Sequence, residues 1–85
     1  MATQDQNLAA GRAALDAAIE HEVIVTELAE SMEWLDGDAS LFEVQRVSTK
    51  ARYHAERAIA YREDARRLFV LAGMTTTEAQ ECVNA

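Results

Sequence analysis

The sequence predicts an all-α protein, in which two long antiparallel helices form a hairpin with close, alanine-rich packing and a short third helix follows. The 85 residues include no proline and only three glycines, so nearly every position is compatible with a helix. Gly37 and Gly73 are each followed within three residues by a helix-capping sequence. Small or apolar residues also recur every seven residues along the second half of the chain, at Val44, Ala51, Ala58, Ala65 and Ala72.

The first long helix is predicted over about residues 6–36, with Thr3 or Asp5 as its cap. One face of this helix is apolar at helical spacing, and we expect it to pack against the second helix. Gly11 lies within this face, where a close helix approach would explain a residue that costs about 1 kcal/mol of helix propensity relative to Ala. The face consists of Ala10, Ala13, Ala14, Ala17, Ala18, Ile24, Val25, Leu28, Met32 and Leu35.

A second apolar row lies on another side of the same helix. It consists of Leu8, Leu15, Ile19 and Val23. One neighbouring helix cannot cover both rows, so the C-terminal segment, a second copy of the chain or a different protein must cover this one. We expect this row to be the partner-binding surface.

Gly37 is expected at the end of the first helix, because the left-handed backbone that often ends helices costs little without a side chain. A turn over residues 37–39 then reverses the chain. Ser40 and Glu43 have the spacing of a capping box, and they predict a second helix over about residues 40–72.

Gly73 is the predicted stop of the second helix. Thr75 and Glu78 have the spacing of a second capping box. A short helix over about residues 76–84 follows, and it must dock on the hairpin because so short a helix is unstable alone. The whole chain is thus one helical domain, to be completed by dimerisation or by a partner.

The formal net charge of −7 argues against direct nucleic-acid binding, which needs clustered Lys and Arg. Acidic side chains dominate the first helix and basic ones the second, which favours pairing of the two helices. The acidic face could instead imitate a nucleic acid. Its exposed members would be Glu20, Glu27, Glu30 and Glu33.

The chain has a single cysteine, Cys82, and shows neither a secretory leader nor an 18-residue uncharged run. These features favour a cytoplasmic protein without a membrane segment. No catalytic motif is present, so we expect neither an enzyme nor a cofactor.

His21 and His54 fall in the middle of the predicted helix contact and come to about the same height when the chain reverses. Neither has a glutamate three residues before it, as a di-iron helical bundle would require. We therefore expect hydrogen-bonded histidines rather than a metal site. Arg62 lies beside the alanine ladder and should either extend outward or reach an acid such as Asp16.

Three segments of the turn and second helix resemble a known family. They are Gly37-Asp38-Ala39-Ser40, Gln45-Arg46 and Ala55-Glu56-Arg57-Ala58-Ile59-Ala60. Over about residues 36–61, the chain resembles the hairpin turn and second helix of the YscE-like co-chaperones of type III secretion. The resemblance implies a small cytoplasmic hairpin that, with a second chaperone on its apolar side, sequesters the needle subunit before export. The longer first helix and the segment after Gly73 depart from that family.

Taken together, these features predict a small non-enzymatic protein-interaction module, which is an adaptor, a co-chaperone or an inhibitor. It would bind a partner protein or a second copy through the Leu8-to-Val23 row. The alternative is an acidic inhibitor of phage or plasmid type that occupies a nucleic-acid-binding surface of a host protein. A structural bundle or a metal-binding four-helix dimer is a third possibility.

Overall fold

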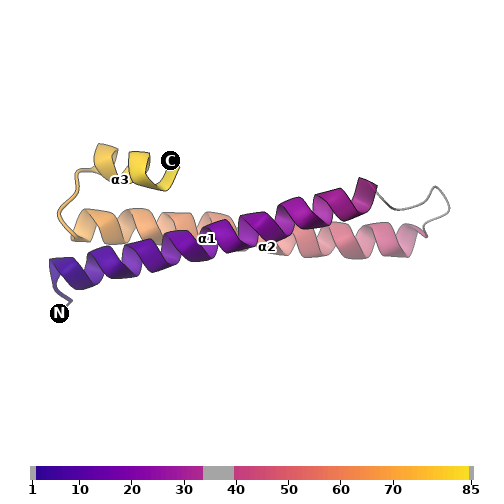
Figure 1. Cartoon of the computed structure of the whole chain (residues 1–85), viewed down its shortest axis with the longest axis horizontal. Helices are drawn as coiled ribbons and strands as arrows, with labels where there is room; N and C mark the ends of the chain where they lie inside the picture. Colours follow the sequence, from indigo (N-terminus) through magenta and orange to yellow (C-terminus); the bar gives the residue numbers. More distant parts are fainter. Residues whose placement is uncertain (1, 34–39, 85) are drawn as a thin grey trace.

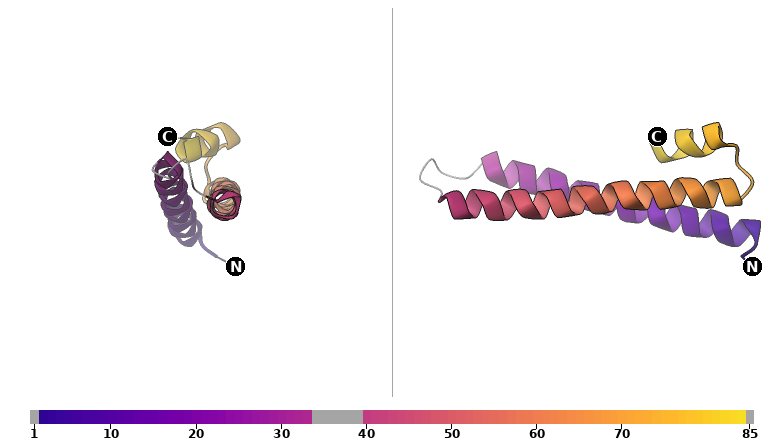
Figure 2. Two further views of the ribbon diagram at one scale, coloured as in Figure 1. Left: turned by 90° about the vertical axis from the view of Figure 1, so that its right-hand side faces the viewer. Right: turned by 180° about the vertical axis from the view of Figure 1, so that it is seen from behind.

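The computed structural model, which describes residues 2–33 and 40–84, confirms the predicted all-α hairpin. Helices α1 (Gln4–Glu33) and α2 (Leu41–Leu71) lie antiparallel side by side, and α3 (Thr76–Asn84) folds back over one side of them (Figures 1 and 2). The molecule measures 54 × 23 × 14 Å. The predicted turn at residues 37–39, with Gly37, and the last three residues of the predicted first helix lie outside the described residues.

The start of α1 is fixed by a capping box that the sequence analysis had not assigned. The Thr3 amide donates to Gln6 Oε1 at 2.8 Å, and the Gln6 amide donates to Thr3 Oγ1 at 3.1 Å. The helix therefore begins at Gln4, two residues earlier than predicted. Thr3, rather than Asp5, is the cap. The Thr3 hydroxyl accepts from the backbone N–H of Gln6, and the side-chain oxygen of Gln6 accepts from the backbone N–H of Thr3.

Both predicted capping sequences start helices. Ser40 Oγ accepts a hydrogen bond from the Glu43 amide at 3.2 Å at the start of α2. Thr75 and Glu78 form the complete reciprocal box at the start of α3, with distances of 3.0 and 3.1 Å. The backbone hydrogen bond from Thr75 also lowers the pKa of Glu78 below its ordinary value.

Gly73 ends α2 as predicted and turns the chain back toward the hairpin. Its φ of 103° is a conformation that a residue with a side chain rarely adopts. The Gly73 amide donates to the Val70 carbonyl and the Met74 amide donates to the Phe69 carbonyl, which is the hydrogen-bond pattern of a Schellman motif. The Met74 side chain packs on the same cluster as Phe69, so this motif sets the direction in which α3 leaves.

Small residues form the contact between α1 and α2. Ala58 and Ala65 of the predicted ladder are buried, and they meet a row on α1 that is centred on Gly11 and Ala18. The prediction that Ala10 and Ala13 belong to this contact was wrong, because both are exposed. The contact follows the row of Gly11 and Ala18, which are seven residues apart. This row lies about 100° around the helix axis from the row that contains Ala10.

Gly11 confirms the predicted close approach of the two helices. A Cβ atom placed at this position would lie 2.7 Å from Cε1 of Phe69. That distance is too short for any side chain, so glycine lets the Phe69 ring lie directly against the α1 backbone.

The buried core lies at the open end of the hairpin, beneath α3. Its centre consists of Ala65, Phe69, Ala79 and Val83. Between Ile19 and Arg57, no described residue is buried. The half of the hairpin nearer the turn therefore depends on partly buried contacts alone.

Replacing Ala58 by Leu should overpack the α1–α2 contact, because Ala58 is only 3% exposed. We expect the free energy of unfolding to fall by about 1–3 kcal/mol, measured by urea denaturation. Ala60→Leu is the matched control, because Ala60 is exposed two positions away on the same helix. Equal effects of the two substitutions would contradict the assignment of Ala58 to the helix contact.

Candidate functional site

The structure divides the predicted partner-binding row into two parts. Leu8 and Leu15 pack against the core cluster that contains Ala79 and Val83 of α3. Ile19 and Val23 remain 44% and 49% exposed. The first half of the row is thus partly buried in the core cluster to which α3 contributes, and the second half stays open.

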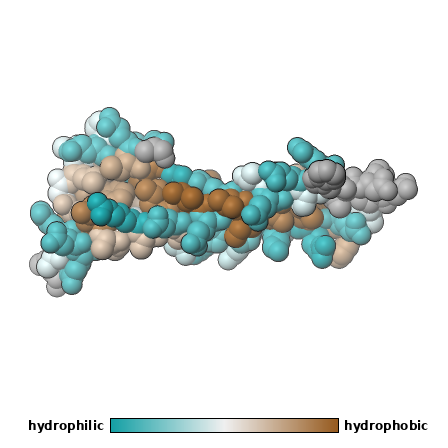
Figure 3. All heavy atoms as spheres, viewed as in Figure 1, coloured by the Kyte–Doolittle hydropathy of each residue, from teal (hydrophilic) through white to brown (hydrophobic). Residues whose placement is uncertain are grey.

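Exposed apolar surface continues from α1 onto α2. Ile59 is exposed and, with Val25 and Ala55, lines a shallow hollow of about 330 Å³ between the two helices. Figure 3 shows hydrophobic surface running as a narrow band along the middle of the molecule between hydrophilic side chains. We call Ile19, Val23 and Ile59 the open apolar surface.

Arg62 joins all three helices where α3 ends. Its Nε and Nη2 atoms donate to the two carboxylate oxygens of Glu22 at 2.8 and 2.6 Å. Its Nη1 atom donates to the carbonyl of Val83, near the C-terminus of α3, which is a favourable place for a cation. The acid that Arg62 reaches is therefore Glu22, not Asp16 as the sequence analysis suggested.

The Glu22–Arg62 ion pair also marks the boundary between the covered and open halves of the row. The side-chain hydrogen bond from Arg62 lowers the pKa of Glu22, so this carboxylate stays ionised to a lower pH than an ordinary glutamate does. A bidentate pair of this kind holds its two side chains in one geometry. Both carboxylate oxygens of Glu22 are thus engaged within the fold.

The four predicted acidic residues lie along α1 and are all exposed. They are Glu20, Glu27, Glu30 and Glu33. In the described part of the chain, the ion pairs are Glu22–Arg62 and Asp64–Arg67, so none of the four is paired there. α1 therefore presents uncompensated negative charge beside Ile19 and Val23.

His21 and His54 meet across the hairpin, as their positions in the sequence predicted. Their Nδ1 atoms are 2.7 Å apart, so one neutral ring donates a hydrogen bond and the other accepts it. The His21 ring stacks on Tyr61 at 5.6 Å, and Tyr53 contacts the edge of His54 at 5.1 Å. Partial burial, together with the nearby His21 and Lys50, lowers the pKa of His54.

The histidine pair does not assemble a metal site within one copy of the chain. In residues 2–33 and 40–84, no three His, Cys, Asp or Glu side chains come together as a metal would require. His54 can instead respond to pH, because partial burial disfavours its protonated form.

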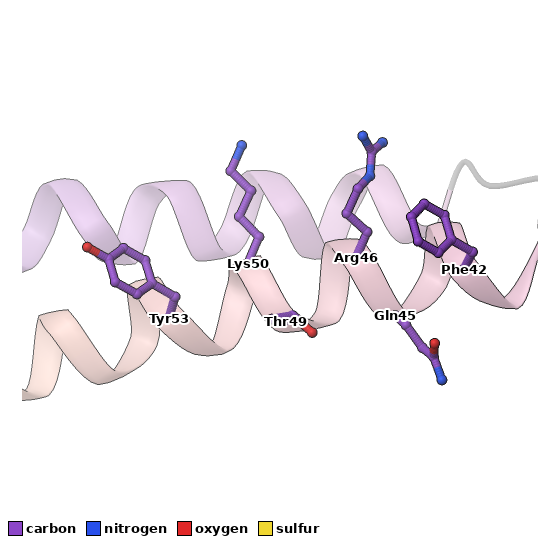
Figure 4. A pocket seen from close by; sticks show the side chains of 6 residues that line it. All are labelled: Phe42, Gln45, Arg46, Thr49, Lys50 and Tyr53. Carbon is purple, nitrogen blue, oxygen red and sulfur yellow. The ribbon is translucent and has the colours of Figure 1, made fainter.

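A surface of aromatic and basic side chains on α2 is the feature that the sequence analysis missed. Phe42 and Tyr53 lie at its two ends, and Arg46 and Lys50 lie between them (Figure 4). The residues border a shallow hollow of about 420 Å³. Their spacing of four, four and three residues is one helix face and could have been found in the sequence.

Comparisons of the chain with protein-family models, with curated proteins and with solved structures found no match. None of the helices that the structure describes is long and apolar enough to cross a membrane.

Lowering the pH from about 7.5 to about 5 should lower the thermal unfolding midpoint. His54 has a pKa below its ordinary 6.5 in the folded protein, so the unfolded chain takes up the proton more readily. Its contribution to stability is complete above pH 6.5 and is lost as the pH falls below that value. The carboxylates with lowered pKa values, Glu22 and Glu78, titrate below this range.

His54→Gln is the matched variant, because an amide can keep a hydrogen bond to His21 without titrating. We expect a weaker pH dependence in differential scanning calorimetry of this variant. The same dependence in both proteins, or none in the wild type, would mean that the pair does not control stability.

Proposed function

We propose that this chain is a small non-enzymatic protein-interaction module that binds its partner through the open apolar surface. The observation that supports this proposal is the division of the α1 row by α3. Leu8 and Leu15 already pack against the cluster that holds Ala79 and Val83 of the nine-residue helix α3, and the same row continues past the end of α3 as Ile19 and Val23. A helix from another protein can extend the same packing along α1.

The charges around the surface define the kind of partner. Glu20 and Glu27 lie on α1 beside Ile19 and Val23, and they are exposed. A partner helix with apolar side chains on one face and Lys or Arg at its edges matches both features. An acidic partner would be repelled.

The role that we propose is that of an adaptor, a co-chaperone or an inhibitor. The resemblance of residues 36–61 to the YscE-like co-chaperones supports the second of these roles. In that role, the apolar side of the hairpin would hold a second chaperone, and the protein would act in the cytoplasm.

A second candidate function is inhibition of a nucleic-acid-binding protein by charge imitation. It is favoured by the exposed carboxylates of Glu20, Glu27, Glu30 and Glu33 on one helix. A partner bound in this way would contact charges more than apolar groups, so its affinity would fall steeply with added salt.

The double substitution Ile19→Asp and Val23→Asp should weaken partner binding at least about tenfold, because buried apolar anchors carry most of the energy of such contacts. The partner is first captured from the native host with the tagged full-length chain and identified. The affinity of the purified pair is then measured by isothermal titration calorimetry, and helicity is checked by circular dichroism. Leu41→Asp is the control, because Leu41 is exposed on the other helix, near the turn.

Unchanged binding by the double variant would contradict the proposal. If binding then fails on replacement of the four glutamates by glutamine, and weakens steeply with salt, charge imitation is the function. If Ile19→Asp and Val23→Asp abolish binding at both low and high salt, the apolar module is supported.

A further inference from the structure

The side of the hairpin away from α3 is a second surface without a cover (Figure 2). Successive helix residues are about 100° apart. The residue just before one that faces α3 therefore points toward the other flank of the hairpin. Arg62 and Phe69 of α2 contact α3 or its cluster. Tyr61 and Leu68 precede them, and with Leu71 they line a hollow of about 370 Å³ on the other flank.

We call this side of the hairpin the lower face. One half of the lower face belongs to α1 and the other to α2, and the side chains of the two halves differ in size. The α1 half is made of mostly small residues at seven-residue spacing, Ala10, Ala17, Ile24 and Ser31. The α2 half carries large exposed side chains, with Phe42 at 73%, Tyr53 at 57% and Leu71 at 63% exposure. Large side chains on one half can therefore enter the space above small ones on the other.

The two halves also differ in charge. Arg46, Lys50 and Arg57 belong to the α2 half. Glu20 and Glu27 lie on the outer edge of α1, which borders both the open apolar surface and the α1 half of the lower face. In the described structure, none of these five side chains forms an ion pair. Arg57 instead lies 4.9 Å above the ring centre of Tyr61. A face that is acidic along one helix and basic along the other is complementary to a copy of itself.

We propose that the lower face joins two copies of this chain about a twofold axis parallel to the hairpin, forming an antiparallel four-helix bundle. This axis places α1 of each copy on α2 of the other. An axis across the hairpin would instead place α1 on α1, acid on acid. The charges therefore select one of the two face-to-face arrangements.

The residues that meet within one hairpin show which residues would lie opposite each other between two copies. Gly11 lies against Phe69, and His21 lies against His54. The same antiparallel register between copies places Glu20 opposite Arg57 and Glu27 opposite Lys50. Both acids then find a cation of the partner copy within one helical turn.

The small size of the buried core explains why the chain would gain stability by forming the four-helix bundle. Among the residues that the structure describes, six apolar residues are buried and four of them are alanines. None of the described residues between Ile19 and Arg57 is buried. A domain of this size gains stability from association, because alone it buries little of its apolar surface. The lower face runs along the poorly covered half, and the register of His21 and His54 places Tyr53 within one helical turn of Ile24 of the partner copy. The open apolar surface lies on the flank that faces α3 and stays accessible.

The test uses two charge-reversed variants of the full chain. Lys50→Glu with Arg57→Glu makes both halves of the lower face acidic, and Glu20→Lys with Glu27→Lys makes both halves basic. By sedimentation equilibrium, the wild type should be a dimer and each variant alone a monomer. A mixture of the two variants should form a one-to-one heterodimer, because each half then meets its opposite charge.

Arg12→Glu with Arg52→Glu is the control. It makes the same change in net charge at two exposed positions outside the lower face, and it should remain dimeric. A single chain with all four lower-face substitutions should also recover the dimer, even if one of the double variants folds poorly. A monomeric wild type, a dimer that persists in both variants, or a mixture and a four-substitution chain that stay monomeric would overturn the proposal.

Discussion

The close approach of α1 and α2 through small residues is the constraint on which the rest of this structure depends. Gly11 admits the Phe69 ring against the α1 backbone, and Ala58 and Ala65 are buried opposite α1. Close backbones leave no room for large side chains between the helices. Most of the large apolar residues must therefore lie on the flanks of the hairpin, where something else has to cover them.

The chain covers part of one flank by itself. Gly73 and the Schellman motif turn α3 back onto the hairpin, where Ala79 and Val83 belong to the cluster against which Leu8 and Leu15 pack. Arg62 links the Val83 carbonyl near the end of α3 to Glu22 of α1. Because α3 has only nine residues, it cannot reach the half of the hairpin near the turn. Its short length leaves Ile19 and Val23 open on the α3 side. Phe42 and Tyr53 are open because they lie on the lower face, away from α3.

The two open surfaces differ in chemistry, and we propose a different occupant for each. The surface beside α3 is apolar at its centre and shares the acidic outer edge of α1 with the lower face, and it suits a helix of another protein with basic side chains at its edges. The lower face carries both charges in separate halves and is complementary to itself. Placing a foreign partner on one and a second copy on the other uses each surface for the binding that its charges favour.

The sequence by itself determined the helices, because their limits depend on local chemistry. Ser40, Gly73 and the Thr75–Glu78 pair act on their own backbone neighbours. The repeat of Ala58 and Ala65 also identified the α2 side of the helix contact. The start of α1 was missed by two residues, although the Thr3–Gln6 pair is as local as the others.

Only the tertiary structure decided which flank each side chain occupies. Ala10, Gly11 and Ala14 are neighbours on one broad apolar face of α1, and the Phe69 ring, distant in sequence, selects Gly11 as the centre. Likewise, no local pattern says that α3 stops beside Glu22, so the split of the Leu8-to-Val23 row was not predictable. The rotation of a helix and the reach of a docked one depend on contacts between distant segments, and these contacts exist only when the chain is folded.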